Sequence, residues 1–344
     1  MSDLILSIKS SFFYFRFYLL SLSIWYALDY NKNFTKNYLN LLIIVQIILI
    51  LDAFIQYKFG TNILGWEKFH PHRVSGFFGD ELVLGSYLAR FLPLTVGLYV
   101  FVNYQKFDAK KTIILFFLIL IIYLGISISG DRTAFYLSLI FLPFLFTLKN
   151  IKYLKKKVYP LAISFFIIFC ILILNSENVK NRLFNSTFNS MISFAGEENT
   201  KINFTLFSHN HEVHFKTAAN MFLDNKFFGV GIKQYRVFCK NEKYFVNRHS
   251  CVTHPHNIYV QFLAELGIVG FSFLFVFFIY VVLKLFKNFF KNKNNSMILF
   301  NYIILSGLFI NLFPFAPSGN FFNNWMSMIY FCPLGFYLYS QKKI

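Results

Sequence analysis

The sequence predicts an all-α fold, a polytopic bundle of about nine transmembrane helices with one large extracytoplasmic loop. Hydrophobic residues make up 56% of the 344 residues and charged residues only 14%, whereas about a quarter of a soluble domain is charged. Several runs of roughly 18–20 residues carry almost no charge, which is the length that crosses about 30 Å of hydrocarbon as a helix. The chain is therefore predicted to be an integral membrane protein.

Nine apolar runs are the candidate spans. They cover residues 6–28, 39–57, 80–102, 112–130, 132–149, 158–175, 257–283, 297–314 and 321–340. No small-residue cleavage site follows the first run, which indicates an uncleaved span rather than a signal peptide. Lys9 and Arg16 lie inside that run, so its helix is either peripheral or has other boundaries.

Basic clusters between the runs predict the topology. They lie at residues 106–111, 149–157, 284–293 and 342–343. Counting spans places all four on one side, which the positive-inside rule assigns to the cytoplasm. The chain then divides into N-terminal transmembrane helices at 1–175, a large outer loop at 176–256 and C-terminal transmembrane helices at 257–344. The net charge of +18 does not predict a nucleic-acid partner, because no basic arm or soluble basic domain is present.

All eight histidines fall in segments that are predicted to lie outside. They are His70, His72, His209, His211, His214, His249, His254 and His256. Imidazole is a common zinc ligand, but the sequence has no HExxH motif, and its His-x-His steps lack a partner at metal-ligand spacing. No Asp-x-Asp pair is present either. We expect no metal and no other cofactor; the alternatives are a metal site and ordinary polar loop residues.

Cysteine and arginine add two expectations. Cys239 and Cys251 both lie in the outer loop, where disulfides persist, so we expect them to pair, with two free thiols as the alternative.

Arg90 lies inside the third run and Arg132 where two runs meet. A charge in a span is costly and indicates a function or a buried partner; for Arg90 the alternatives are an ion pair with Asp80 or Glu81 and a side chain that reaches the surface. Arginine is also the residue best suited to clamp a diphosphate.

Four motifs resemble the O-antigen ligase and O-antigen polymerase superfamily of bacterial envelopes, over residues 70–340. In "HNIYVQFLAELGIVG", His256 and Asn257 are followed by Gly267 and Gly270 in that family's His-Asn, Gly-x-x-Gly pattern. "MFLDNKFFGVGIKQYR", "SGDRTAF" and "RVSGFFGDELVLGSYL" resemble its Gly-x-Gly turn and two arginine elements. The resemblance implies a multi-pass protein of the bacterial inner membrane, with its active site and the 176–256 loop facing the periplasm.

The resemblance also implies an activity and its site. The family transfers a glycan, without metal, from undecaprenyl diphosphate to an acceptor hydroxyl, on the lipid A core for a ligase or on a lipid-linked glycan for a polymerase. His256 matches the family's essential histidine and Arg132 its diphosphate-binding arginine, with Arg73 expected at the rim of the same cavity. A second arginine of the family's loop is replaced here by His211. The alternatives for that position are Lys216, Arg236 and Arg248.

The residues themselves suggest how this site is built. Pro255 disfavours helix in the residue before it, and Asn257 is a good N-cap for the helix that follows. His256 would then lie at a helix N-terminus, where the dipole disfavours imidazolium and a neutral ring can accept a proton. Gly267 and Gly270 would let neighbouring helices approach closely. A capping motif with an idle histidine is the plain alternative; a transporter or flippase for an anionic lipid or solute is a further one, although transporters place polar residues at the membrane midplane.

Overall fold

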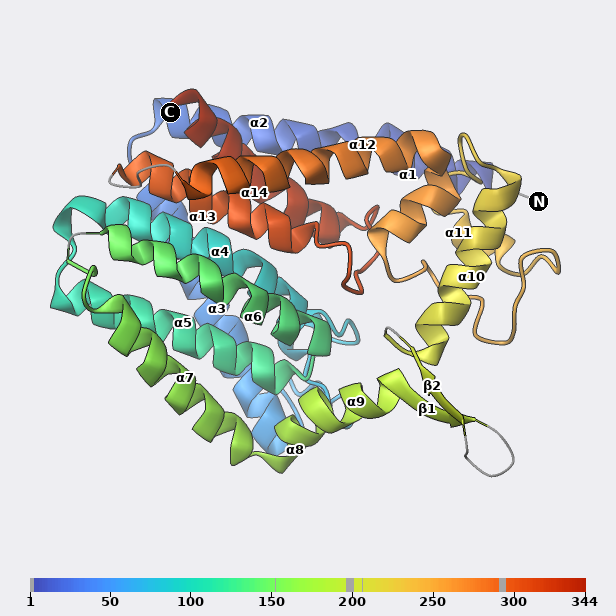
Figure 1. The fold of residues 1–344 in the computed structure, drawn as a ribbon, viewed down its shortest axis with the longest axis horizontal. Coiled ribbons are helices and arrows are strands. Elements are labelled where there is room, and N and C mark those ends of the chain that lie inside the picture. The colour runs from blue at the N-terminus through green and yellow to red at the C-terminus, as the bar shows by residue number, and fades with distance from the viewer. Residues whose placement is uncertain (1–2, 152, 196–200, 206, 291–294) are drawn as a thin grey trace. The chain divides into compact units, whose positions relative to one another are not determined.

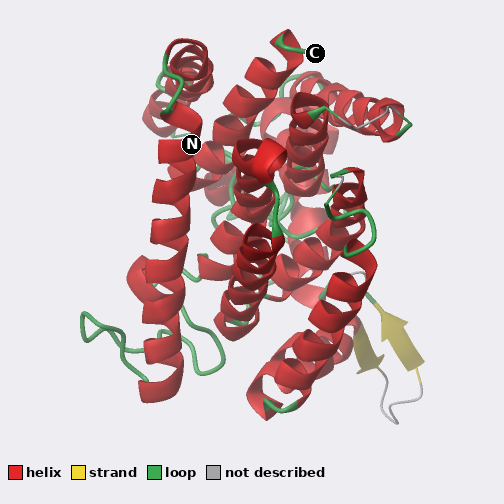
Figure 2. Cartoon of the chain, turned by 90° about the vertical axis from the view of Figure 1, so that its left-hand side faces the viewer, coloured by secondary structure: helices red, strands yellow, loops and turns green. Residues whose placement is uncertain are grey.

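The computed structural model describes residues 3–151, 153–195, 201–205, 207–290 and 295–344. Its regular structure is helical apart from one antiparallel hairpin of β1 (Ile192–Ala195) and β2 (Lys201–Phe204), which the all-α prediction did not include (Figures 1 and 2). The chain forms two compact units. Unit 1 comprises Met1–Leu22, Thr187–Leu283 and Leu312–Cys332; unit 2 comprises Ser23–Ser186, Lys284–Asn311 and Pro333–Ile344.

Within the described residues, five helices are long and apolar enough to cross a membrane. They are α3 (Phe34–Phe59), α4 with its 3-10 extension η2 (Leu84–Lys106), α5 (Ala109–Ser129), α6 with η3 (Arg132–Lys149) and α12 (Ile258–Phe289). The class of fold, a helical protein with several membrane spans, is therefore confirmed. The number nine stays a prediction, because α7 (Val158–Leu174) and α13 (Ser296–Asn311) have only 17 and 16 residues.

The first predicted span is divided in the structure. α1 (Leu4–Phe12) has Phe13 as its C-cap, and α2 (Phe15–Tyr30) begins after a break. α1 is held by unit 1, since Ser7 Oγ donates a 2.8 Å hydrogen bond to the carbonyl of Ile232. A single helix over 6–28 is therefore wrong. Lys152, Lys291 and Lys293 of the predicted basic clusters lie outside the described residues.

The core of unit 2 is built around α4, whose residues from Leu88 to Val100 are all buried. It packs against α3, α5, α6 and α13. Small residues permit the closest of these contacts: a methyl group added at Gly97 would meet Ile303 and Ile304, and one added at Gly307 would meet Pro93. Close backbone approach of this kind replaces the hydrophobic driving force that helices lack in lipid.

The predicted outer loop folds into several elements. They are α8 (Glu177–Lys180), the π-helical turn η4 (Asn181–Asn185), α9 (Ser186–Met191), the hairpin, α10 (His209–Asp224) and α11 (Tyr235–Phe238). The part before Thr187 belongs to unit 2 and the rest to unit 1. Tyr235 and Cys239 lie with α10 and α12 residues in a buried cluster that is the small core of unit 1.

α12 is kinked at Gly267, which has φ +64° and ψ −163°. At the kink, the N–H of Ile268 donates a 2.7 Å hydrogen bond to the carbonyl of Lys226. One helical turn before the kink, the carbonyl of Ala264 accepts a 2.9 Å hydrogen bond from the N–H of Val230. A side chain at Gly267 would collide with the Phe227 backbone. Gly267 thus allows the 226–230 loop, rather than a neighbouring helix, to pack closely against α12. Gly270 faces Leu266 of its own helix, so the expectation of helix contacts at these two glycines is wrong.

Candidate functional site

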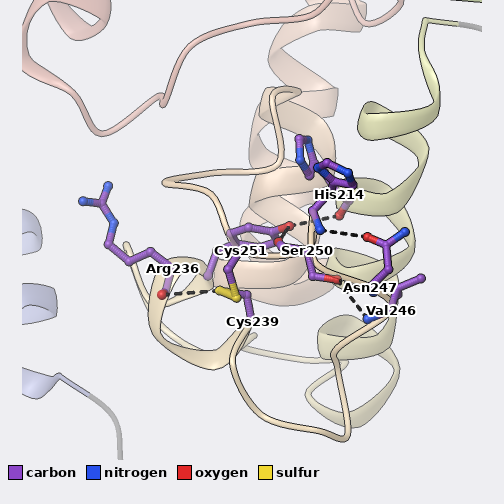
Figure 3. Close-up of a disulfide and its surroundings, with 9 residues drawn as sticks. His214, Arg236, Cys239, Val246, Asn247, Ser250 and Cys251 are labelled. Carbon is purple, nitrogen blue, oxygen red and sulfur yellow. Dashed lines mark hydrogen bonds between the residues drawn. A yellow bond between two sulfur atoms is a disulfide. The ribbon is translucent and has the colours of Figure 1, made fainter.

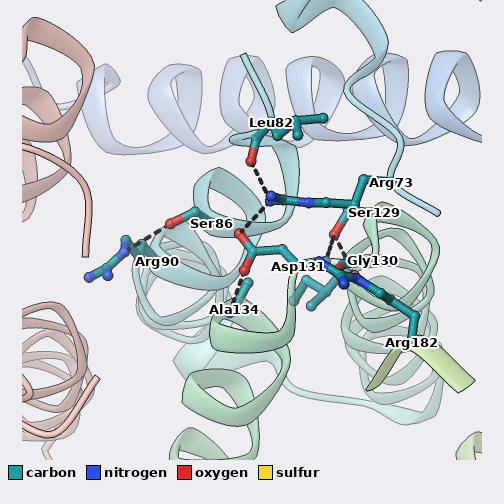
Figure 4. Close-up of polar contacts among 10 residues, drawn as sticks. Arg73, Leu82, Ser86, Arg90, Ser129, Gly130, Asp131, Ala134 and Arg182 are labelled. Atoms are coloured by element: carbon teal, nitrogen blue, oxygen red, sulfur yellow. Dashed lines mark hydrogen bonds and ion pairs between the residues drawn. The ribbon is translucent and has the colours of Figure 1, made fainter. Parts of the chain in front are cut away.

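Three arginines, termed the arginine cluster, surround the turn between α5 and α6 in unit 2: Arg73, Arg132 and Arg182. Arg73 Nη2 donates a 2.7 Å hydrogen bond to the Leu82 carbonyl and lies 3.9 Å from Asp131 Oδ2 (Figure 4). Arg182 Nε donates to the Gly130 carbonyl at 3.3 Å. Gly130 makes this turn possible with φ +66°, and the Asp131 side chain caps α6.

The three cations of the cluster act on one another. Arg132 Nη1 donates to the Ser186 carbonyl at 2.8 Å, which holds its side chain next to the segment that carries Arg182. Burial, and then the charges of Arg132 and Arg73, lower the pKa of Arg182, while Asp131 opposes them. Three positive charges around one carboxylate create a positive potential that attracts an anion.

A small cavity adjoins the cluster. Its volume is about 50 Å³, and its polar lining includes Lys68, His72, Arg73 and Arg182. A cavity of this size holds only a few waters, so binding of a diphosphate requires the arginine side chains to turn aside. The pKa of His70 is lowered by burial and then by Arg182 and Arg73, which places this histidine in the same positive field.

Arg90 has a buried partner, which is a helix end rather than an acidic side chain. Its side chain is buried; Nε donates to Ser86 Oγ and Nη1 to the Asn311 carbonyl, both at 3.1 Å. Asn311 is the last residue of α13, so Arg90 satisfies a terminal carbonyl at the negative end of a helix dipole. Asp80 and Glu81 form no ion pair with it within the described residues. The proposed ion pair is therefore wrong.

Four histidines gather in unit 1, on α10 and on the segment before α12, and form the histidine cluster: His211, His214, His254 and His256. The ring centroids of His256 and His254 are 4.3 Å apart. Those of His214 and His211 lie 5.3 and 5.5 Å from that of His256. In the part of the chain that the structure describes, no three His, Cys, Asp or Glu side chains are placed to hold a metal ion.

The backbone at His256 is unusual. Its φ of +56° lies in the left-handed region, which few residues other than glycine adopt. The His256 carbonyl accepts a 2.8 Å hydrogen bond from Ser318 N–H. Asn257 Oδ1 accepts from the N–H groups of Tyr259 and Val260, at 3.0 and 3.1 Å, so the predicted N-cap is confirmed. Strain of this kind is retained where the surroundings enforce it, often at functional sites.

Burial keeps three rings of the histidine cluster, those of His214, His254 and His256, uncharged. It lowers the pKa of His256 to about 3, with further lowering by His254, His211 and His214. Burial also lowers the pKa of His254 to about 4, and that of His214 is lowered by the same cause. Near pH 7 these rings are neutral, and each has one nitrogen that can accept a proton.

Hydrogen bonds fix the tautomer of His254. Its Nε2 lies 3.1 Å from the Ser318 carbonyl, which only accepts, so the proton is on Nε2. Nδ1 then accepts from the Thr253 hydroxyl at 2.8 Å. The His256 ring has no such bond among the described residues, and its nitrogens are left for a ligand. His211 Nδ1 contacts Ser208 Oγ at 2.7 Å.

Only some of the candidates for the family's second loop arginine lie near the histidine cluster. His211 is in the histidine cluster, and Arg236 acts electrostatically on His254. Arg236 Nε is buried with no hydrogen-bond partner among the described atoms. Lys216 and Arg248 are exposed. His211 and Arg236 are therefore the ones that remain near the site.

A disulfide joins Cys239 to Cys251, with a Cα–Cα distance of 5.1 Å (Figure 3). It ties α11 to the segment that leads into the histidine cluster. The buried Tyr235 hydroxyl donates toward the Ser250 carbonyl at 2.9 Å and the His214 carbonyl at 3.3 Å. The chain around the cysteines is thus fixed to α10 beside the cluster.

Two charged residues escaped the sequence reasoning. Arg182 could not be predicted from the sequence, because its approach to Gly130 depends on how the chain folds back after α7. Glu265 is fully buried in α12 and accepts from Tyr235 N–H at 3.2 Å and from Gln261 Nε2 at 3.0 Å. The signal for Glu265 was available, since a carboxylate in an apolar helix is costly and rare.

The two clusters lie in different units, so a common cavity for Arg132 and His256 stays a prediction. Residues 113–275 match the profile of the O-antigen ligase family. No curated protein sequence matches the chain. The matched range includes Arg132, Arg182, the whole histidine cluster and the kink at Gly267, but not Arg73. The chain is thus a membrane protein with several candidate spans whose residues 113–275 are similar to the O-antigen ligase family.

Proposed function

We propose that the protein is a glycosyltransferase that moves a glycan from undecaprenyl diphosphate to an acceptor sugar hydroxyl at the periplasmic face of the bacterial inner membrane. The observation that carries this proposal is the neutral His256 ring, buried among three other histidines on a strained backbone next to a helix N-terminus. The alternative, a transporter or flippase for an anionic lipid or solute, more often places its polar residues at the membrane midplane. The acceptor is the lipid A core for a ligase, or a second lipid-linked glycan for a polymerase.

In the proposed reaction the acceptor oxygen attacks the anomeric carbon while His256 takes the hydroxyl proton. The bond from that carbon to the diphosphate oxygen breaks, and the diphosphate leaves with the electron pair. A single displacement of this kind inverts the anomeric centre. The pKa of about 3 makes free His256 a weak base, but an anionic donor beside the ring favours the imidazolium and raises its pKa.

The arginine cluster is proposed to hold the diphosphate. Arg132 has the role that the resemblance implies, and Arg73 lies at the rim. Arg182 is a further ligand for the diphosphate, because it lies next to the turn that carries Arg132. His211 and Arg236 stay the candidates for the second loop position. Guanidinium groups suit this task, since they stay charged and form paired hydrogen bonds to phosphate oxygens.

The test is transfer by purified protein with a lipid-linked donor and acceptor. His256→Ala should lower transfer by about 10²–10⁴-fold, as expected for loss of a general base, while donor binding is largely retained. His209→Ala is the matched control, because His209 is exposed on α10 outside the cluster. Wild-type transfer by the His256 variant would refute the mechanism.

Deletion of the gene in its host distinguishes the two acceptors. For a ligase, a glycolipid gel should show lipid A core without glycan while polymeric lipid-linked donor accumulates. For a polymerase, a single repeat unit should remain on the core.

A further inference from the structure

A second cavity in unit 2 lies beside the N-terminal half of α5, whereas the arginine cluster surrounds the turn after the C-terminal end of α5. Its volume is about 560 Å³, within the range of about 300–1,000 Å³ that is usual for small-molecule sites. It is bounded by the first half of α5, the last half of α6 and the first half of α7, three helices that lie side by side (Figure 1). Apart from Thr112 and Tyr159 its walls are apolar, for example Leu142, Leu148 and Ala162.

A hydrocarbon chain fits such a space. The cavity has almost no polar groups that could hold water. Two residues of its lining, Phe146 and Tyr159, are exposed, and their ring centroids are 6.0 Å apart. Lipid tails gain no hydrophobic energy by moving from bilayer to protein. Occupancy therefore depends on shape and on what binds the head group.

Positively charged side chains next to the cavity lining could bind such a head group. Lys155, Lys156 and Lys157 are exposed and lie directly between Leu154 and Tyr159, which line the cavity. Lys157 Nζ lies 3.6 Å from the centroid of the Tyr153 ring. Residues 146–165 contain no aspartate or glutamate, so no acidic side chain of this segment neutralises the lysines. A basic cluster of this kind attracts anionic lipid head groups.

We propose that this cavity binds one anionic phospholipid, with an acyl chain between α5, α6 and α7 and the head-group phosphate at Lys155–Lys157. The site uses none of the residues assigned to glycan transfer, so it stands or falls separately from the proposed reaction. A polyprenyl chain is the competing occupant. It would fill the same walls without needing the lysines.

The experiment compares lipid binding by native mass spectrometry after transfer from nanodiscs that contain equal phosphatidylglycerol and phosphatidylcholine. The wild-type protein should retain phosphatidylglycerol preferentially. Replacing Lys155, Lys156 and Lys157 by Gln should lower that preference by roughly tenfold or more, since each basic residue contributes near an anionic surface. Replacing Lys284 and Lys287 on α12 by Gln is the matched control and should leave the preference unchanged.

Ala162→Leu narrows the cavity and should lower retention of both lipids while the lysines remain. Gel filtration of each variant verifies that it is folded. Equal retention of both lipids by the wild-type protein would overturn the proposal, as would an equal loss in the control variant. Undecaprenyl phosphate that displaces phospholipid equally well from the wild-type protein and from the triple Gln variant would show a polyprenyl site instead.

Discussion

At His256 the main chain and the ring are fixed by different neighbours. The φ of +56° turns the chain from Pro255 into α12, and Ser318 holds the carbonyl. The ring meets three other imidazoles and stays neutral through burial. Pro255 and Asn257 predicted the helix start from the sequence, because an N-cap bonds the backbone of residues only two or three positions away. The ring neighbours His211 and His214 could not be predicted, because they come from α10, which is remote in sequence.

Arg182 gives the first prediction at the scale of single residues. Arg182→Ala should weaken donor binding by roughly ten- to a hundredfold, because a hydrogen bond to a charged group contributes about 1.5–3 kcal/mol. Arg182→Lys should recover part of the loss, since it restores the charge but not the paired donors. The measurement is titration with a lipid diphosphate. Arg248→Ala is the control; an equal loss there, or none at Arg182, would remove Arg182 from the site.

The pH dependence of stability is the second prediction at this scale. An unfolded histidine has a pKa of about 6.5, whereas folding lowers those of His256 and His254 to about 3 and 4. Between these values the unfolded chain binds more protons, so stability is complete above about pH 6.5 and is lost as the pH falls toward 4. His254→Gln should lower the slope of unfolding free energy by up to about 1.4 kcal/mol per pH unit. The exposed His209→Gln should leave the slope unchanged, and an equally steep slope in both variants would contradict this assignment.

At the scale of elements, the sequence predicts helices well and their interruptions poorly. The apolar runs at 112–130 and 257–283 correspond to α5 and α12, because a span must satisfy its backbone within itself. The kink of α12 is set by the chain at 226–230, which is remote in sequence. Arg90 illustrates the same limit: its cost in a span was evident, but its partner at the end of α13 was not.

Gly267→Ala tests the kink. The substitution forces a side chain into a left-handed backbone, which costs about 1–3 kcal/mol, and into contact with Phe227. The melting temperature and the rate of glycan transfer should both fall. Gly60→Ala is a matched control, because Gly60 also has positive φ, +88°, but nothing lies within 4 Å of the added methyl group. A smaller effect at Gly267 than at Gly60 would show that the contact with the 226–230 chain is dispensable.

At the scale of the whole molecule, the chemistry is divided between two units. The chain passes from one unit to the other five times, after residues 22, 186, 283, 311 and 332. Four of these boundaries fall within helices, namely α2, α9, α12 and α14 (Asn324–Lys342). In the proposed reaction, the arginine cluster of unit 2 binds the diphosphate and His256 of unit 1 is the neutral base. Such a division suits a transferase, because the leaving group and the nucleophile need opposite environments.

The last prediction follows from that division. A donor carrying a photoactivatable group on its first sugar should label peptides of both units, around Arg182 and around His211, if Arg132 and His256 face one cavity. Arg132→Ala should lower both labels together, because donor binding precedes attack. Inverted vesicles and intact cells distinguish the two faces of the membrane, and labelling only from the cytoplasmic side would contradict the periplasmic site. Labelling of one unit alone, with His256 still required for transfer, would mean that donor and base meet only after the units rearrange.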